Sequence, residues 1–203
     1  MDVRLITPQG MERHESDQIG SLLDGLGLLW IDVAYWDAST EKKLVKLLNL
    51  HPRAAHDCAV RNPLPKAHTY PEQVFVVLHG PQQGARGHVH YVELNQYVGP
   101  NWVITVHGPM NPAVPLDAAY VETAAITRRL EAGRLCPSRP GELSAALVGV
   151  LTGRLRDFLT ELTQDVWRLE REVTAGHMGN PENFLEELFG RDTGYWCYAP
   201  WRR

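Results

Sequence analysis

A stripe of apolar residues near the C-terminal end constrains the fold of this chain more than any other feature. Its members recur at intervals of three or four residues: Leu143, Leu147, Leu151, Leu155, Phe158, Leu162, Val166, Leu169 and Val173. This spacing places them on one side of an α-helix and predicts a single long helix over residues 142–173. Gly149 and Gly153 each weaken that helix by about 1 kcal/mol relative to alanine. We expect a shorter helix over residues 181–189 to pack against it as a hairpin.

The part of the chain before residue 136 alternates between short apolar segments and helical patterns, which predicts an α/β fold. Five segments are typical of strands: residues 3–6, 28–33, 74–78, 91–94 and 103–106. The third segment is almost entirely apolar, as in a strand covered on both faces, and we expect Val76 and Ile104 to be buried. Helices on one or both sides of such a mixed sheet make an α/β/α sandwich.

Between the first two strands, Ile19, Leu22, Leu23 and Leu26 fall at helical spacing, and three more helices are expected farther along the chain. Asp37 can cap a helix that ends near Asn49, because its side chain accepts hydrogen bonds from the first turn. Pro52 suits the first position of a short helix that carries Asp57, since the N–H that proline lacks has no partner there. A further apolar stripe over residues 116–130 predicts the third helix.

The charge and the cysteine content exclude several classes of function. The net charge of −4 and the lack of any Lys/Arg-rich segment argue against binding to DNA or RNA. Three widely spaced cysteines without a Cys-x-x-Cys pair favour neither a disulfide framework nor a zinc site, so we expect a reducing, cytoplasmic environment. No apolar run reaches the roughly 18 to 20 residues of a membrane helix, and the start lacks a signal-peptide pattern. The chain as given is therefore expected to be soluble.

Five segments of the chain form a recognisable series. They are Trp30-Ile-Asp-Val33, Leu50-His-Pro52 with Asp57, Leu64-Pro-Lys66 with Tyr70 and the apolar run to His79, Val103-Ile-Thr-Val-His107, and the helical segment over residues 142–173. Each segment alone is common, and the specificity lies in their order. In that order the chain resembles the N-terminal cytosolic domain of CorA-type magnesium and cobalt transporters. The resemblance implies an α/β/α sandwich with a mixed sheet, followed by the long helix of a C-terminal helical hairpin.

The resemblance also implies a regulatory, metal-sensing function. In this family an acidic pair on the short helix after His-Pro takes part in regulatory Mg²⁺ binding between neighbouring subunits of a homopentamer. Here His56 replaces the first acid of the pair, so that Asp57 is the candidate metal ligand. Gly149 and Gly153 stand where relatives commonly have aspartate. Because Mg²⁺ dehydrates reluctantly and prefers several oxygen ligands, we expect this regulatory Mg²⁺ to bind weakly.

The membrane segment of the family has no counterpart in this sequence. Relatives continue with a charged stalk helix and two membrane helices joined by Gly-Met-Asn, which are not found here. We expect an α/β sandwich over residues 1–135, a helical hairpin leading to a truncated stalk over residues 136–190, and an irregular tail over residues 191–203. Such a fragment, without a pore, is expected in the cytoplasm, whereas a full-length relative lies at the cytoplasmic face of the plasma membrane.

Two other functions are consistent with the residues. The apolar stripe and an aromatic tail could serve a soluble, self-associating interaction domain with no transport role. In the second alternative, a metalloenzyme, His88 and His90 point to one side of a strand and share a transition metal with His79 or His107. Enzyme activity is not expected, since phosphate-loop, nucleophile-elbow and dinucleotide fingerprints are missing.

Four other residues have simpler expected roles. Cys58 follows Asp57, whose charge raises a thiol pKa, so a nucleophilic role is not expected. Trp30 and Tyr70 flank apolar runs and are expected to pack against the sheet. Lys66 is expected to pair with a carboxylate near the short helix, an interaction that contributes little where it is exposed.

Overall fold

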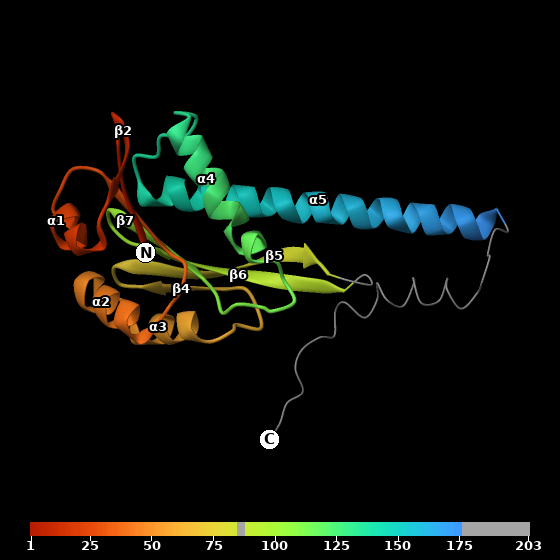
Figure 1. Cartoon of the computed structure of the whole chain (residues 1–203), viewed down its shortest axis with the longest axis horizontal. Coiled ribbons are helices and arrows are strands. Elements are labelled where there is room, and N and C mark those ends of the chain that lie inside the picture. Colours follow the sequence, from red (N-terminus) through yellow and green to blue (C-terminus); the bar gives the residue numbers. More distant parts are fainter. Residues whose placement is uncertain (85–87, 176–203) are drawn as a thin grey trace, which may run out of the picture.

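A seven-stranded mixed sheet forms the middle layer of the protein (Figure 1). The computed structural model describes residues 1–84 and 88–175. The strands are β1 (Asp2–Thr7), β2 (Gly10–His14), β3 (Leu28–Val33), β4 (Lys66–Tyr70), β5 (Gln73–Gln83), β6 (Val89–Val98) and β7 (Trp102–His107). They lie in the order β2-β1-β3-β7-β6-β5-β4, in which β3 and β7 are parallel and the other neighbours are antiparallel. The predicted mixed sheet is confirmed.

Helices cover both faces of this sheet. One face packs against α1 (Ile19–Leu23), α2 (Ala38–Leu48) and α3 (Pro52–Ala59), and the short 3-10 helix η1 (Ser16–Gln18) precedes α1. The opposite face packs against α4 (Val121–Glu131) and α5 (Pro140–Thr174), and the 3-10 helix η3 (Leu116–Tyr120) leads into α4. The predicted α/β/α sandwich is therefore confirmed.

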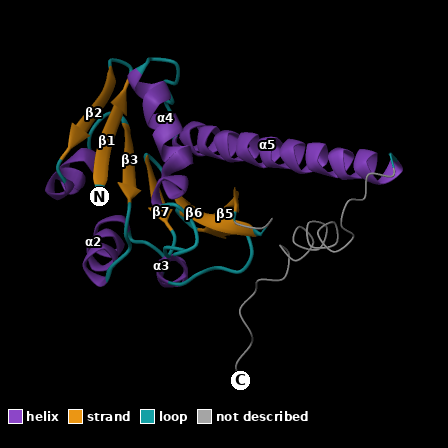
Figure 2. Ribbon diagram, turned by 45° about the vertical axis from the view of Figure 1, so that its right-hand side comes forward, coloured by secondary structure: helices purple, strands orange, loops and turns teal. Residues whose placement is uncertain are grey.

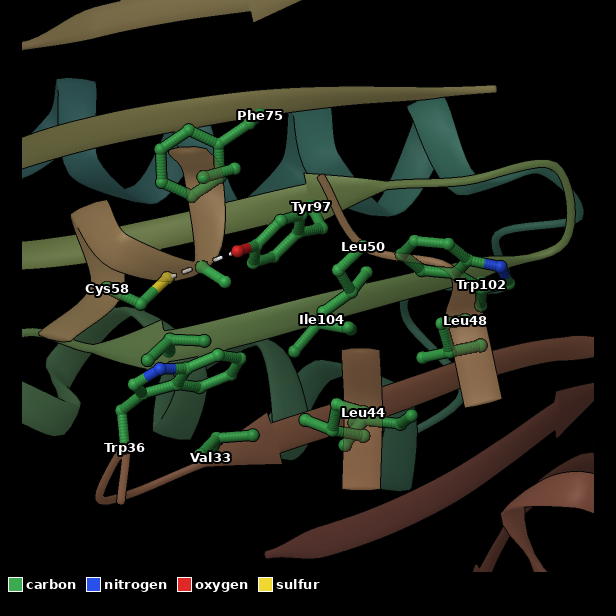
Figure 3. Packing of buried hydrophobic residues seen from close by; sticks show 14 of the residues in the cluster. Val33, Trp36, Leu44, Leu48, Leu50, Cys58, Phe75, Tyr97, Trp102 and Ile104 are labelled. Carbon is green, nitrogen blue, oxygen red and sulfur yellow. Dashed lines mark hydrogen bonds between the residues drawn. The ribbon is translucent and has the colours of Figure 1, made fainter. Parts of the chain in front are cut away.

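The larger apolar core lies between the sheet and the pair α2 and α3 (Figure 3). Phe75, Tyr97 and Ile104, from three neighbouring strands, are fully buried there together with Leu44 of α2. The rings of Phe75 and Tyr97 lie 4.7 Å apart, centroid to centroid, in a tilted arrangement. Each such side chain contributes roughly 1.5–3 kcal/mol to folding when it is removed from water. These contacts hold α2 and α3 on the sheet.

The ends of α2 and α3 follow the local chemistry that the sequence predicts. The side chain of Asp37 accepts a hydrogen bond of 2.7 Å from the backbone N–H of Thr40 and so caps α2. The helix ends at Asn49, whose φ of 50° is left-handed, a conformation that asparagine adopts more readily than most residues. Pro52 occupies the first turn of α3, as expected.

The long helix α5 runs unbroken from Pro140 to Thr174, through both glycines, and confirms the predicted helix. Its first turns are buried against the sheet by Leu143, Leu147 and Leu151. Farther along, the helix extends past the end of the sheet (Figure 2), and Leu159 is 55% exposed. The predicted partner helix over residues 181–189 and the tail over residues 191–203 lie outside the described residues.

One arginine ties α5 to three other segments. Arg154 donates through Nε to the backbone oxygen of Pro81 (2.9 Å) and through Nη2 to Oε1 of Gln82 (3.0 Å). Its Nη1 donates to the backbone oxygen of Ala118 (3.1 Å) and to Oε1 of Glu122 (3.0 Å). The carboxylate of Glu122 is only 2% exposed, so this is a buried ion pair between α4 and α5. Charge-assisted bonds of this kind are stronger than neutral ones and fix geometry.

A glycine lets α5 approach the sheet closely at this point. A Cβ atom on Gly80 of β5 would lie 3.1 Å from Nη1 of Arg154 and 3.2 Å from Cδ1 of Leu151. These distances are tighter than ordinary van der Waals contacts, so a side chain at this position would push the helix or its arginine aside. The small residue therefore sets the depth at which α5 sits on β5.

Three details differ from the prediction. Val76 is half-buried rather than buried, because α5 crosses β5 near Gly80 and leaves the outward side of Val76 partly uncovered. Two strands, β2 and β4, were not predicted, since both are short, polar and exposed edge strands without an apolar pattern. The helical segment from residue 116 begins as the 3-10 helix η3 and becomes α-helical only at Val121.

Candidate functional site

The candidate metal ligand Asp57 lies in the last turns of α3, beside the edge strand β4. Its Oδ2 is 2.8 Å from Nζ of Lys66, the first residue of β4, so the predicted pairing of Lys66 with a nearby carboxylate is confirmed. The side chain of Asp57 is 18% exposed and that of Lys66 is 32% exposed. The carboxylate is thus accessible from solvent, yet it already has a cationic partner.

A surface hollow of about 550 Å³ opens beside this ion pair. Its lining consists of Pro52, Arg53, His56, Asp57, Lys66, His68, Thr69 and Tyr70. Asp57 is the one carboxylate in that lining, against two permanently charged basic side chains and two imidazoles. Tyr70 packs as expected, since its ring stacks on the imidazole of His51 with a centroid distance of 3.9 Å.

A buried carboxylate holds the end of α3 in place. Glu93 of β6 accepts hydrogen bonds of 2.8 Å from the backbone N–H and from the side-chain amide of Asn62, and one of 2.9 Å from Asn95. The same amide of Asn62 donates to the backbone oxygens of Asp57 (2.8 Å) and Val60 (3.3 Å). Asn62 therefore closes the C-terminal end of α3, and Glu93 fixes Asn62 to the sheet.

The sequence did not predict the contact of Glu93 with Asn62, nor the ion pair of Arg154 with Glu122. A signal was present in the spacing: Glu122 precedes Ile126 by four residues and Leu130 by eight, and it shares their buried side of α4. Alternation along β6 likewise places Glu93 on the same face as the buried Tyr97. A charged residue at an apolar position of a pattern predicts a buried polar contact.

Cys58 has no reactive environment. The thiol is buried, and it donates to the hydroxyl of Tyr97 over 3.6 Å (Figure 3). Burial raises the pKa of the Cys58 thiol to about 12. The thiolate that nucleophilic chemistry requires is therefore scarce at neutral pH.

The histidines of the described part of the chain do not converge into a metal site. Among residues 1–84 and 88–175, His, Cys, Asp and Glu side chains nowhere gather in groups of three that could hold a metal ion. His79 stacks near Tyr91, with 5.8 Å between ring centroids, and burial lowers the pKa of the His79 imidazole. His107 belongs to a separate network below α4. The structure therefore does not bring together the set expected for a metalloenzyme.

A chain of buried polar contacts runs from β3 to η3. Nε1 of Trp30 donates to Oγ1 of Thr105 (3.0 Å), and that hydroxyl donates to Oδ1 of Asp32 (2.5 Å). The imidazole of His107 places Nε2 3.0 Å from the same carboxylate oxygen and Nδ1 2.8 Å from the backbone oxygen of Ala119. Both ring nitrogens of His107 therefore lie within hydrogen-bonding distance of an oxygen atom.

This network predicts an acid-sensitive contribution to stability. Burial alone raises the pKa of Asp32, but the hydrogen bonds from His107 and Thr105 outweigh it, and the pKa lies below its ordinary value. We expect Asp32→Asn to lower the free energy of unfolding by about 2 kcal/mol at pH 7. Because the folded pKa is depressed, the difference is full above the unfolded pKa of about 4 and fades as the pH falls through the folded pKa. Urea denaturation of both proteins between pH 7 and pH 2 measures it, and a constant difference would contradict the assignment.

The sequence profile of the family described as CorA-like Mg²⁺ transporter protein matches residues 25–192. No curated protein sequence matches the chain. The fold is similar to full-length CmaX protein (TM-score 0.74, 19% identity, covering 96% of this chain and 58% of that chain). It is also similar to the complete CorA magnesium transporter from Methanocaldococcus jannaschii (0.66, 14%, 96% and 57%) and to the soluble domain of CorA from that organism (0.65, 16%, 93% and 69%).

The chain spans less than three fifths of the length of the two full-length proteins that it resembles. Over the described ranges, no helix combines the length and the apolar character that crossing a bilayer requires. The family profile covers most of the chain, including every strand from β3 onward and both long helical segments of the second helical layer. The chain therefore belongs to the CorA-like Mg²⁺ transporter protein family.

Proposed function

We propose that this chain is a cytosolic, metal-sensing regulatory domain of a CorA-like divalent-cation transporter. In this proposal Asp57 is a ligand of the regulatory ion, and Mg²⁺ is the ion expected from the family. The observation that carries the proposal is the position of Asp57, which lines an open surface hollow. Asn62 and Glu93 hold the C-terminal end of its helix by hydrogen bonds.

A regulatory ion at this position needs oxygen ligands from elsewhere. Asp57 supplies one carboxylate, and the other described residues that line the hollow include no acidic group. Mg²⁺ takes six ligands and retains several waters, so we propose that a neighbouring subunit of a homo-oligomer, a pentamer by family resemblance, supplies the rest. Such an ion regulates only to the extent that it binds one arrangement of the subunits more tightly than another.

The cytosolic placement is supported by the cysteines of the described chain. Cys58 and Cys136 are both free thiols, and Cys136 is exposed. Exposed free thiols fit a compartment in which cysteines stay reduced. We propose that residues 1–175 regulate transport, and that the pore belongs to other parts of a full-length assembly.

Self-association without a metal is the second candidate function. The distal part of α5 exposes Leu159 (55%), Val166 (45%) and Trp167 (60%). Exposed apolar side chains that follow one helix are typical of contact surfaces. Sedimentation velocity with and without Mg²⁺ distinguishes the two candidates, because a metal-sensing assembly changes its mass distribution with the ion and a purely apolar one does not.

A thermal-shift titration tests the metal proposal. We expect 1 mM Mg²⁺ to raise the Tm by no more than about 2 °C, because a dissociation constant near 1 mM stabilises the fold by about 0.4 kcal/mol. Asp57→Ala is expected to abolish this shift. A large shift at micromolar Mg²⁺ that persists in Asp57→Ala would place the ion elsewhere, and no shift at any concentration would remove metal sensing by the isolated chain.

A further inference from the structure

We infer that Lys66 sets the affinity of Asp57 for divalent cations, because its ammonium group occupies the position on the carboxylate that a metal ion would take. The inference rests on the proposed function only in naming Asp57 as the ligand. The new element is Lys66, whose positive charge is opposite to that of Asp57 and opposes the binding of a metal ion. A divalent ion then binds at Asp57 against the repulsion of an ammonium group that belongs to the chain itself.

The geometry makes Lys66 a direct competitor for the carboxylate of Asp57. Its Nζ is 2.8 Å from Oδ2 of Asp57, within direct hydrogen-bonding distance of a charged pair. Its backbone is held in β4, where it lies opposite Val77 of β5. The tether keeps the ammonium group beside the carboxylate at a high effective concentration, independently of the ions in solution.

The surrounding charges act in the same direction. Arg53 and Lys66 carry permanent positive charge in the lining of the hollow, and His56 and His68 add two nitrogen bases there. Asp57 is the only acid of that lining. A divalent cation entering the hollow is therefore repelled by fixed cations while it is attracted by a single carboxylate. Hydrated Mg²⁺ also gains little from one carboxylate compared with water.

Removing the charge of Lys66 should therefore strengthen metal binding. For a divalent ion about 4 Å from the ammonium group, even the dielectric of water gives a repulsion that corresponds to at least about a tenfold change in affinity. We expect Lys66→Gln to bind the ion at least about tenfold more tightly than the native chain. Lys66→Arg keeps the charge and should bind like the native chain.

Mn²⁺ is the probe for this experiment, since it favours the same oxygen ligands as Mg²⁺ and broadens the NMR signals of nearby amides. The native chain, Lys66→Gln and Lys66→Arg are titrated, and broadening is followed at the amides of α3 and β4. Arg156→Gln is the matched control, because it removes the same charge from an exposed site on α5, across the sheet. Melting curves by circular dichroism confirm that each variant is folded.

The expected result is tighter Mn²⁺ binding in Lys66→Gln alone, which is lost in the double variant Lys66→Gln with Asp57→Asn. Equal affinity of the native chain and Lys66→Gln at Asp57 would overturn the inference and leave the proposed metal site intact. Binding in Lys66→Gln but not in the native chain supports the inference and overturns metal sensing by the native chain. Absence of broadening around Asp57 in Lys66→Gln overturns the inference.

Discussion

Replacing Arg154 by methionine is expected to lower the free energy of unfolding by about 3 kcal/mol. The guanidinium group makes bonds to β5, η3 and α4, and its removal leaves the carboxylate of Glu122 buried without its counter-ion. For a chain of this length the Tm should fall by about 6–12 °C, which calorimetry measures directly.

The matched control is Arg156→Met on the same helix, whose guanidinium is 76% exposed and pairs with the exposed Asp157. That substitution should change stability by less than about 0.5 kcal/mol. Adding Glu122→Leu to Arg154→Met should recover part of the loss, because no unpaired charge remains. If both arginine substitutions had equal effects, Arg154 would not act as the tie between α5 and the sandwich.

Glu93→Ala is expected to destabilise the fold by about 3 kcal/mol and to loosen α3 in particular. The substitution leaves the backbone N–H and the side-chain amide of Asn62 and the amide of Asn95 without their acceptor. Asn62 then no longer holds the end of the helix that carries Asp57. Hydrogen exchange of the α3 amides should accelerate more than exchange in α2, which the cap at Asp37 still supports.

Two further variants make this prediction specific. Glu93→Gln retains one oxygen acceptor and should lie between the native chain and Glu93→Ala in stability. Glu161→Ala removes an exposed carboxylate from α5 and should be nearly neutral. Uniform acceleration of exchange throughout the sandwich would indicate a general loss of stability rather than a device that positions α3.

Hydrophobic periodicity and the residues typical of helix ends predicted most of the fold. The apolar stripe from Leu143 predicted α5, and Asp37, Asn49 and Pro52 marked helix ends that the structure contains. The edge strands β2 and β4 were not predicted, because they expose most of their side chains and so lack an alternation of apolar and polar residues. Val76 was misjudged since its burial depends on where α5 crosses the sheet, which is a property of the tertiary arrangement.

The candidate site was predictable only in part, for a similar reason. Asp57 as a metal ligand stays a prediction from the resemblance. The pairing of Lys66 with a carboxylate near the short helix was predicted, and the structure identifies that carboxylate as Asp57. The contact of Glu93 with Asn62 joins residues 31 apart in sequence, and that of Arg154 with Glu122 joins residues 32 apart. No local period connects such partners. They become visible only when the sheet register and the helix crossing are known.

The reach of α5 beyond Arg154 gives the domain a mechanical property. From Arg154 to Thr174 the helix continues for roughly 30 Å at its ordinary rise per residue. A tilt of only about 5° at Arg154 therefore carries the far end through nearly 3 Å, whereas the sheet next to the pivot hardly moves. In geometric terms the helix is a lever arm whose inner end lies at the contact of Gly80 with Arg154. A small rotation of the helix within the sandwich would therefore be enlarged at Thr174.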